Sequence, residues 1–315
     1  MLADPLPSWN DGRAKSAILS FVQKTTDPKS PDFIPEGERI ATFDQDGTLW
    51  VEHPMVTQIT FAFERVGALA PTNPTWKDTE PFKSILTGDE AGMAKFTIQD
   101  LMAIAGATHS GVTTADFEEI VSGWVAKARD PRWNRPYTDL VYQPMLEVMQ
   151  HLRASGFRVY IVTGGGQAFV RAFAQATYDV PPDRVIGSTG KTKYTYNKEG
   201  RGVLMKEPDL LFFDDVAAKP EDIYLFLGRR PNAAFGNSDG DRPMLEYTHE
   251  NSGATLGMLV MHDDAEREYA YGPAKGLPPS KLSPFSQATY DEAIAKGWSV
   301  ISMKNDWKQI FAFEE

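Results

Sequence analysis

The sequence predicts a doubly wound α/β fold with a parallel sheet, and two observations indicate it. Four apolar runs, each about the length of one strand, recur along the 315-residue chain with helical patterns between them. Continuous apolar strands separated by helices are typical of a parallel sheet that is covered on both faces. In addition, polar side chains directly follow three of these runs, as expected at the carboxyl edge of such a sheet.

The predicted strands are apolar and rich in β-branched and aromatic residues. They are RIATFD (39–44), FRVYIVT (157–163), NAAFGN (232–237) and ATLGMLVM (254–261). A hairpin is expected around KYTYNKEGRGVL, with its turn at residues 197–200. The segment GSTGKT (187–192) imitates the end of a phosphate-binding P-loop. Because Val185 stands where that pattern requires glycine, we interpret the segment as strand and loop.

Helical patterns flank the second strand. PMLEVMQHLRASG precedes it, with Pro144 near its start and Gly156 just past its end, and GQAFVRAFAQAT follows it. Between the first and second strands lie roughly a hundred residues, far more than a strand-to-helix connection needs. Within them, TQITFAFERVGALA and TTADFEEIVSGWVAKARD look helical, the second with possible N-caps at Thr113 and Thr114. We therefore expect an α-helical insertion directly after the first strand.

The composition is that of a globular protein, with 42% apolar and 24% charged residues. The net charge of −11 disfavours nucleic acid and anionic membranes as partners, but it does not exclude an anionic small-molecule substrate. The chain has no cysteine, which rules out disulfides, thiolate nucleophiles and zinc–thiolate sites. No apolar run approaches the length of a transmembrane helix.

The oligomeric state and the compartment stay open. The start of the chain, MLADPLPSWNDG, is polar and proline-rich and is not typical of a signal peptide. We expect a periplasmic or secreted protein if a signal peptide has been removed before this start, and a cytoplasmic protein otherwise.

Polar groups follow the predicted strands at the edge where a doubly wound sheet carries its reactive site. Asp44 and Asp46 follow the first strand in DQDGT, where Gly47 makes a turn feasible. The remaining groups come from the later strand ends and from AAKPEDI, which precedes the third strand. They are Thr163 with Gly164, Gly165 and Gly166, then Lys219, then Asn237, Asp239 and Asp241.

These residue types suit phosphoryl transfer. Neighbouring carboxylates resist ionising together unless a cation lies among them, and oxygen-only ligands suit Mg²⁺. One carboxylate can attack phosphorus while the other donates and later accepts a proton, which splits the displacement into two easier steps. A metal and a lysine would neutralise the phosphoryl oxygens. A plain strand-end turn at Asp46 is the ordinary alternative.

In these motifs the sequence resembles the haloacid dehalogenase superfamily, and within it the phosphoserine-phosphatase-like branch with a helical, C1-type cap. The matching motifs are DQDGT (44–48), IVTGG around Thr163, AKPEDI around Lys219, and GNSDGDRPML (236–245). They occur in the family's order. The resemblance implies a Rossmann-like core formed by residues 1–50 and 136–315, and a cap domain formed by residues 51–135.

The resemblance also implies roles for these residues. Asp44 would be the nucleophile that forms an aspartyl-phosphate, and Asp46 would be the general acid and base. Asp44 and the backbone carbonyl of Asp46 would bind Mg²⁺. The expected phosphate-binding groups are Thr163, Lys219, Gly164 and Gly165.

One motif departs from the family pattern. This branch usually begins its last motif with Gly-Asp, whereas here Gly236 is followed by Asn237. Asn237 can still ligate Mg²⁺ through its amide oxygen, but it brings no negative charge. Asp241, or else Asp239, is therefore expected to carry the metal contact directly or through water.

The expected function is a Mg²⁺-dependent phosphatase that hydrolyses a small phosphomonoester. The dehalogenases of the superfamily lack an aspartate at the position of Asp46, whereas a phosphatase needs an acid there that protonates the leaving oxygen. Two alternatives stay open. The first is a phosphotransferase or phosphomutase that uses the same aspartyl-phosphate. The second is a catalytically weak phosphate-binding protein, and Asn237 is its only support.

For two residues of the insertion, more than one role is open. Glu52 and Arg65 in the insertion could face the substrate, or they could pack and solvate the cap. We interpret FFDDV (212–216) as the polar edge of a loop before Lys219, and HDDAERE (262–268) as a charged surface.

Overall fold

The computed structural model describes residues 4–314; the first three residues of the proline-rich start and residue 315 lie outside the described part. The strands are β1 (Ile40–Phe43), β2 (Arg158–Gly166), β3 (Val185–Tyr196), β4 (Gly202–Phe212), β5 (Ala233–Gly236), β6 (Leu256–Met261) and β7 (Ser299–Ser302). They form one seven-stranded sheet in the order β4-β3-β2-β1-β5-β6-β7. All neighbours pair in parallel except β3 and β4, which are antiparallel. This confirms the predicted doubly wound, Rossmann-like α/β fold.

The four predicted apolar strands are confirmed as β1, β2, β5 and β6. The predicted hairpin is also confirmed, because β3 and β4 pair up to Tyr196 and Gly202 around the expected turn. The segment GSTGKT lies within β3, which agrees with its interpretation as a strand. The edge strand β7 was not predicted, because its four residues SVIS contain only two apolar side chains.

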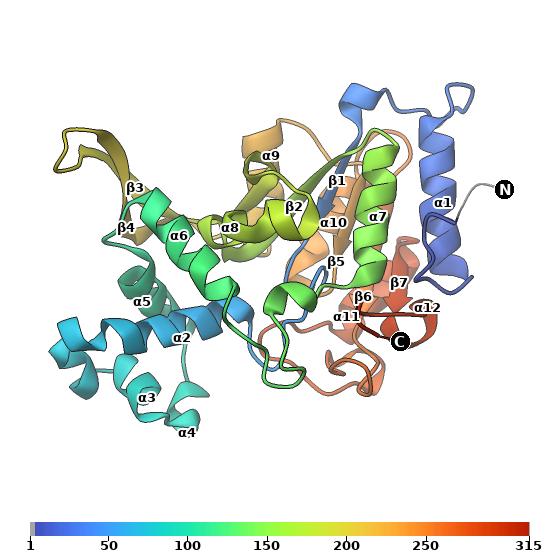
Figure 1. Ribbon diagram of the computed structural model, residues 1–315. Helices are drawn as coiled ribbons and strands as arrows, with labels where there is room; N and C mark the ends of the chain where they lie inside the picture. The colour runs from blue at the N-terminus through green and yellow to red at the C-terminus, as the bar shows by residue number, and fades with distance from the viewer. Residues whose placement is uncertain (1–3, 315) are drawn as a thin grey trace.

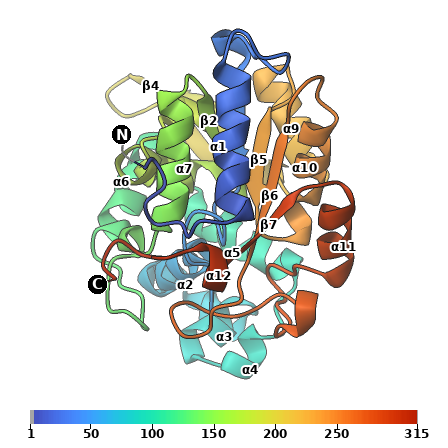
Figure 2. The same cartoon turned by 90° about the vertical axis from the view of Figure 1, so that its right-hand side faces the viewer.

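Helices cover both faces of the sheet, as Figure 1 and Figure 2 show. The helices of the first face are α1 (Arg13–Thr26), α7 (Gln143–Ala154) and α8 (Gln167–Tyr178), and those of the second are α9 (Ala218–Leu227), α10 (Arg242–His249) and α11 (Gln287–Ala295). Alternate residues of one strand serve opposite faces. Phe235 stacks on Phe43 at 4.3 Å on the first face, and Ala234 packs with the helices of the second. A last short helix, α12 (Met303–Asp306), follows β7.

The long segment between β1 and α7 is helical, as predicted. Its helices are α2 (Thr57–Leu69), α3 (Phe82–Thr87), α4 (Glu90–Met93), α5 (Ile98–His109) and α6 (Thr114–Val125). Thr113 caps α6 and forms a capping box with Asp116, which confirms the predicted start. Figure 1 shows α2 to α5 grouped beyond one end of the sheet, where α5 and α6 pack against the hairpin strand β4.

Among the described helices, none combines the length and the apolarity that crossing a bilayer requires.

Candidate active site

The register of the sheet brings the predicted strand-end residues together. Phe43 at the end of β1 pairs with Ile161 of β2 on one side and with Phe235 of β5 on the other. Thr163 and Asn237 therefore both lie two residues beyond this level, next to the segment that carries Asp44 and Asp46. Parallel strands align their carboxyl ends, so these groups meet at one edge.

Lys219, in the first turn of α9, reaches into this edge. Its Nζ donates to Oδ1 of Asp44 and to Oδ1 of Asp241, each at 2.6 Å, and to the carbonyl of Val162 at 3.2 Å. All three side chains of this lysine cluster (Lys219, Asp44 and Asp241) are buried, with at most 9% of a side chain exposed. The sequence thus brings together three residues that lie 22 to 197 positions apart along the chain.

Charge in the lysine cluster is unbalanced. Burial alone would lower the pKa of Lys219, but Asp241 and Asp44 outweigh it and raise this pKa above its ordinary value. Burial raises the pKa of Asp44, and the Asp241 carboxylate adds to the effect while Lys219 opposes it. Lys219 is therefore a fixed cation that two carboxylates share.

Asp46 lies in a different environment although it is only two residues from Asp44. Its Oδ1 accepts a hydrogen bond from Nε1 of Trp50 at 2.7 Å. Burial raises the pKa of Asp46 to about 6, and the bond from Trp50 and the charge of Lys219 act against this rise. A carboxyl group with a pKa near neutrality is suited to donate and accept a proton.

The carboxyl end of β2 carries Thr163 and three glycines, where the pairing with β3 shifts in register. Thr163 is fully buried, and its Oγ1 accepts a hydrogen bond from the amide of Gly165 at 3.0 Å. A side chain at Gly165 would meet this hydroxyl at 3.2 Å and Oδ2 of Asp46 at 3.6 Å, so this glycine lies directly beside Asp46. The amide of Gly166 donates to Oε1 of Gln58 at 2.7 Å, which connects α2 to the end of β2.

Asn237 forms a second cluster with Glu52. Its Oδ1 accepts from the hydroxyl of Thr48 at 3.1 Å, and its Nδ2 donates to Oε1 of Glu52 at 2.8 Å. Glu52 also accepts from the hydroxyl of Tyr271 at 2.6 Å and from the hydroxyl of Ser283. We call these four residues (Glu52, Asn237, Tyr271 and Ser283) the glutamate cluster. Burial raises the pKa of Glu52 to about 7, against the opposing effects of His262 and the two hydroxyl groups.

The segment HDDAERE is not a charged surface, which corrects the prediction. His262 and Glu268 are buried, and Nδ1 of His262 lies 3.0 Å from Oε2 of Glu268. Burial lowers the pKa of His262, but Glu268 outweighs it and raises this pKa above its ordinary value, so the protonated Nε2 can donate to the Gly47 carbonyl at 2.7 Å. A sequence signal existed, because His262 directly follows β6 just as Asp44 follows β1.

The two aspartates of the last motif have different partners. Oδ2 of Asp241 accepts from the amides of Asn237 at 2.9 Å and Ser238 at 3.0 Å, and Lys219 occupies its other oxygen. Oδ1 of Asp239 accepts from the amide and hydroxyl of Ser286, at 2.9 and 3.0 Å. Asp241 thus fixes the loop after β5 at the strand ends, whereas Asp239 connects this loop to the start of α11.

The two residues of the insertion that could face the substrate, Glu52 and Arg65, lie in different places. Glu52 joins the strand-end groups. Arg65, in α2, is half-buried and donates from Nε to the carbonyl of Thr108 at 2.9 Å, which is a contact within the helical segment. Gln58, which no sequence motif indicated, is an α2 residue that contacts the end of β2.

Asp214 in FFDDV is fully buried and is not the polar edge of a loop, which corrects the second surface prediction. Both of its carboxylate oxygens lack a hydrogen-bond partner among the described residues. Burial raises its pKa to about 8, and the charge of Lys219 opposes this rise.

The donor set at the strand ends fits a hard divalent cation such as Mg²⁺. Asp44 and Asp241 are buried carboxylates and Asp46 is half-buried beside them, and in the described part of the chain Lys219 is the one basic residue that forms ion pairs with Asp44 and Asp241. Such an excess of buried negative charge needs a further cation. No three His, Cys, Asp or Glu side chains between residues 4 and 314 are grouped closely enough to hold a metal by themselves. The fit therefore includes the amide oxygen of Asn237 and the backbone carbonyl of Asp46.

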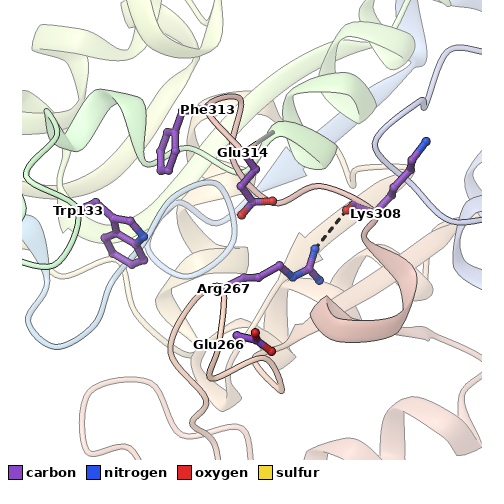
Figure 3. Close-up of a pocket in the computed structure, with 6 residues that line it drawn as sticks. All are labelled: Trp133, Glu266, Arg267, Lys308, Phe313 and Glu314. Carbon is purple, nitrogen blue, oxygen red and sulfur yellow. Dashed lines mark hydrogen bonds between the residues drawn. The ribbon is translucent and has the colours of Figure 1, made fainter.

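A separate pocket of about 430 Å³ lies elsewhere on the molecule (Figure 3). It is lined by Trp133, Glu266, Arg267, Lys308, Phe313 and Glu314. Arg267 is already engaged, because it donates to the carbonyl of Lys308 at 3.3 Å and to Oδ2 of Asp264 at 2.7 Å. None of the lining residues belongs to the strand-end groups, so the candidate site rests on the geometry of the strand ends.

Solved structures that are similar to this chain share little sequence with it. A protein of unknown function from Bordetella pertussis Tohama I is 15% identical, with a TM-score of 0.50, over 84% of this chain and 98% of that one. A functionally unknown protein from Anaerococcus prevotii is 14% identical, with a TM-score of 0.49, over 80% of this chain and 86% of that one. A phosphoserine phosphohydrolase-like protein from Francisella tularensis is 16% identical, with a TM-score of 0.37, over 71% and 88%.

No curated protein sequence is significantly similar to the chain. The family model of haloacid dehalogenase-like hydrolases, in contrast, matches residues 41–246. This range includes β1 to β5, the lysine cluster, Asp46, Thr163 and Asn237. The chain therefore belongs to the haloacid dehalogenase-like hydrolase family.

Proposed function

We propose that the protein is a phosphatase that hydrolyses a small phosphomonoester through an aspartyl-phosphate on Asp44, with Mg²⁺ bound at the strand ends. One observation carries the proposal. Two neighbouring carboxylates have different partners: Asp44 accepts from the Lys219 ammonium at 2.6 Å, whereas Asp46 accepts from the neutral N–H of Trp50 at 2.7 Å. A nucleophile and a proton donor require such a difference.

In the first half-reaction, a carboxylate oxygen of Asp44 forms a bond to phosphorus and the bond from phosphorus to the ester oxygen breaks. Protonated Asp46 donates its proton to this leaving oxygen, so the product leaves as an alcohol. Lys219 balances the negative charge beside Asp44. The Thr163 hydroxyl and the amides of Gly164 and Gly165 bind the phosphoryl oxygens.

In the second half-reaction, the ionised Asp46 takes a proton from a water molecule, whose oxygen attacks phosphorus. The bond between phosphorus and Asp44 breaks, inorganic phosphate forms, and both aspartates regain their first protonation states. Asp44, the carbonyl of Asp46 and Asn237 would hold Mg²⁺, and Asp241 or Asp239 would act through water. When bound, the ion supplies positive charge that neutralises the phosphoryl oxygens.

The position of the helical segment favours a small substrate. We propose that residues 51–135 are a cap domain inserted between the two parts of the core, 1–50 and 136–315. The hydrogen bond from Gly166 to Gln58 holds α2 against the carboxyl end of β2, which limits the space above this phosphoryl-binding segment. A cap in contact with the phosphoryl-binding segment excludes water and large substrates.

The test is phosphate release from a panel of small phosphate esters, with and without Mg²⁺. We expect Mg²⁺-dependent release from at least one ester. Asp44→Asn should reduce it by on the order of 10⁴-fold or more, because the nucleophile is lost. The matched control is Asp78→Asn, which removes an exposed carboxylate in the helical segment and should leave the rate unchanged. Near-wild-type turnover by Asp44→Asn would exclude the proposed nucleophile.

A second variant tests the proton donor. Asp46→Asn should either accumulate the aspartyl-phosphate or lose about 10²- to 10⁴-fold in rate. Unchanged single-turnover hydrolysis would contradict the role of Asp46. Substrate consumption that far exceeds phosphate release would indicate transfer to an alcohol acceptor instead of water.

A further inference from the structure

The glutamate cluster lies at the point where this chain departs from its family. At the motif position that usually carries aspartate, Asn237 offers a neutral amide. Its Nδ2 donates to Oε1 of Glu52 at 2.8 Å, so a carboxylate is present one hydrogen bond further out. The acidic group that is missing at position 237 is thus found on a residue that follows β1.

Among residues 4–314, the carboxylate of Glu52 forms no ion pair. Its three donors, Asn237, Tyr271 and Ser283, are all neutral. The nearby cation His262 forms its ion pair with Glu268 instead. Because Glu52 is only 2% exposed, solvent does not compensate its charge. A buried carboxylate with neutral donors alone is stable where an external cation lies close to it.

The cluster packs directly against the turn that carries Asp46. Gly47 has a φ of 72°, and a Cβ at this position would overlap Nδ2 of Asn237 and the carboxylate of Glu52. The pair therefore lies next to the backbone that would present the Asp46 carbonyl to a metal. On the other side of the amide, Oδ1 of Asn237 is directed to Thr48, which fixes the amide orientation. An N–H donated to a carboxylate also polarises the amide and makes its oxygen a stronger ligand.

We propose that Glu52 and Asn237 together replace the missing aspartate, with Glu52 as the positioning residue that supplies the negative charge and Asn237 as the oxygen ligand of a hard divalent cation such as Mg²⁺. This inference rests on the proposed function. It assigns Glu52 to the metal and not to the substrate, because hydrogen bonds from the protein occupy both of its carboxylate oxygens. Partners of this kind set the affinity of metal sites.

The experiment is Mg²⁺ binding by calorimetry, without substrate, at one fixed pH. Glu52→Gln should weaken binding about 10- to 100-fold, because the charge is lost. The double variant Glu52→Gln with Asn237→Asp exchanges the acid and the amide between the two positions, so that the negative charge moves from residue 52 to residue 237. It should return the affinity to within about threefold of wild type, and this rescue is the result that a purely structural role of Glu52 cannot give.

Three further variants separate charge from packing. Glu147→Gln is the matched control, since Glu147 is also buried and also accepts from a serine hydroxyl, that of Ser8, but lies in α7. Tyr271→Phe and Ser283→Ala each remove a donor to Glu52 and keep its charge. All three should bind Mg²⁺ within about threefold of wild type.

The outcomes distinguish this inference from the proposed function. If the wild type binds Mg²⁺ and Glu52→Gln binds it equally well, the inference is wrong and the proposed function stands. If the wild type binds no Mg²⁺, both are wrong. Should Glu52→Gln fail to fold, the double variant decides: affinity near wild type supports the inference, and a loss of more than about tenfold overturns it.

Discussion

Two buried clusters flank the Asp46–Gly47 turn, and they handle charge in opposite ways. In the lysine cluster, two carboxylates share one ammonium at 2.6 Å each. In the glutamate cluster, one carboxylate accepts three hydrogen bonds from neutral groups. The first therefore compensates much of its charge inside the protein, whereas the second leaves its charge available to a ligand. The difference teaches that equal burial does not imply an equal role.

The largest expected effect follows from removing the shared ammonium. Lys219→Met leaves Asp44 and Asp241 buried without their counter-ion, which should lower the free energy of unfolding by about 3–5 kcal/mol. Tyr271→Phe removes one neutral donor from the glutamate cluster and should lower it by only about 1 kcal/mol. Urea unfolding without added Mg²⁺ measures both. Equal losses in the two variants would end the distinction between the clusters.

A pH-dependent effect is expected for the ion pair beside the glutamate cluster. Because Glu268 raises the pKa of His262, the pair stabilises the fold fully below the unfolded pKa of about 6.5 and loses this contribution as pH rises through the folded pKa. Glu268→Gln should therefore destabilise the protein by up to about 3 kcal/mol at acidic pH, and by less at alkaline pH. Denaturation at a series of pH values checks this. A difference that grows with pH would contradict the charged state of His262.

A smaller effect is expected for the pKa of Asp46, which belongs to neither cluster. The N–H of Trp50 lowers the pKa of Asp46, so Trp50→Phe should raise this pKa while keeping the aromatic stacking on Phe173. If the first half-reaction needs protonated Asp46, kcat/KM falls as pH rises through this pKa. The alkaline limb of the profile should therefore shift to higher pH, by less than about one unit. A shift to lower pH would contradict the role of Asp46 as the acid.

The smallest effect is expected at Asp239, which lies outside both clusters. Its carboxylate accepts from Ser286 at the start of α11, and an asparagine oxygen can accept the same bonds. Asp239→Asn should lower the free energy of unfolding by about 0.5–1 kcal/mol and change phosphatase activity less than tenfold. A thermal melt and a rate assay test this. A loss of activity as large as that of Asp44→Asn would indicate that Asp239 contacts the metal directly.

Local patterns predicted most of the sheet and its reactive edge. β1, β2, β5 and β6 are continuous apolar runs, and Asp44, Thr163 and Asn237 follow such runs directly. The short edge strand β7 carries no such pattern, because serines stand at both of its ends.

The glutamate cluster was not predictable in the same way. Its members lie 12 to 231 residues apart along the chain, and each segment alone looks like an ordinary loop. The acidic run HDDAERE was misinterpreted for a related reason. Its charges are neutralised by partners within the fold, such as His262 with Glu268 and Arg267 with Asp264, and the pattern of charges along the chain is the same as that of a solvated surface.

The hydrogen bond between Gly166 and Gln58 has a consequence for how a ligand could enter. If α2 moved away from β2, this bond would break, and the freed amide of Gly166 would need another acceptor. An anionic ligand could accept from this amide, so the opening of the site and the gain of a hydrogen-bond donor for the ligand would be coupled. Replacing Gln58 by a residue with a shorter side chain would then change both the affinity for the anionic ligand and the free energy of opening the site.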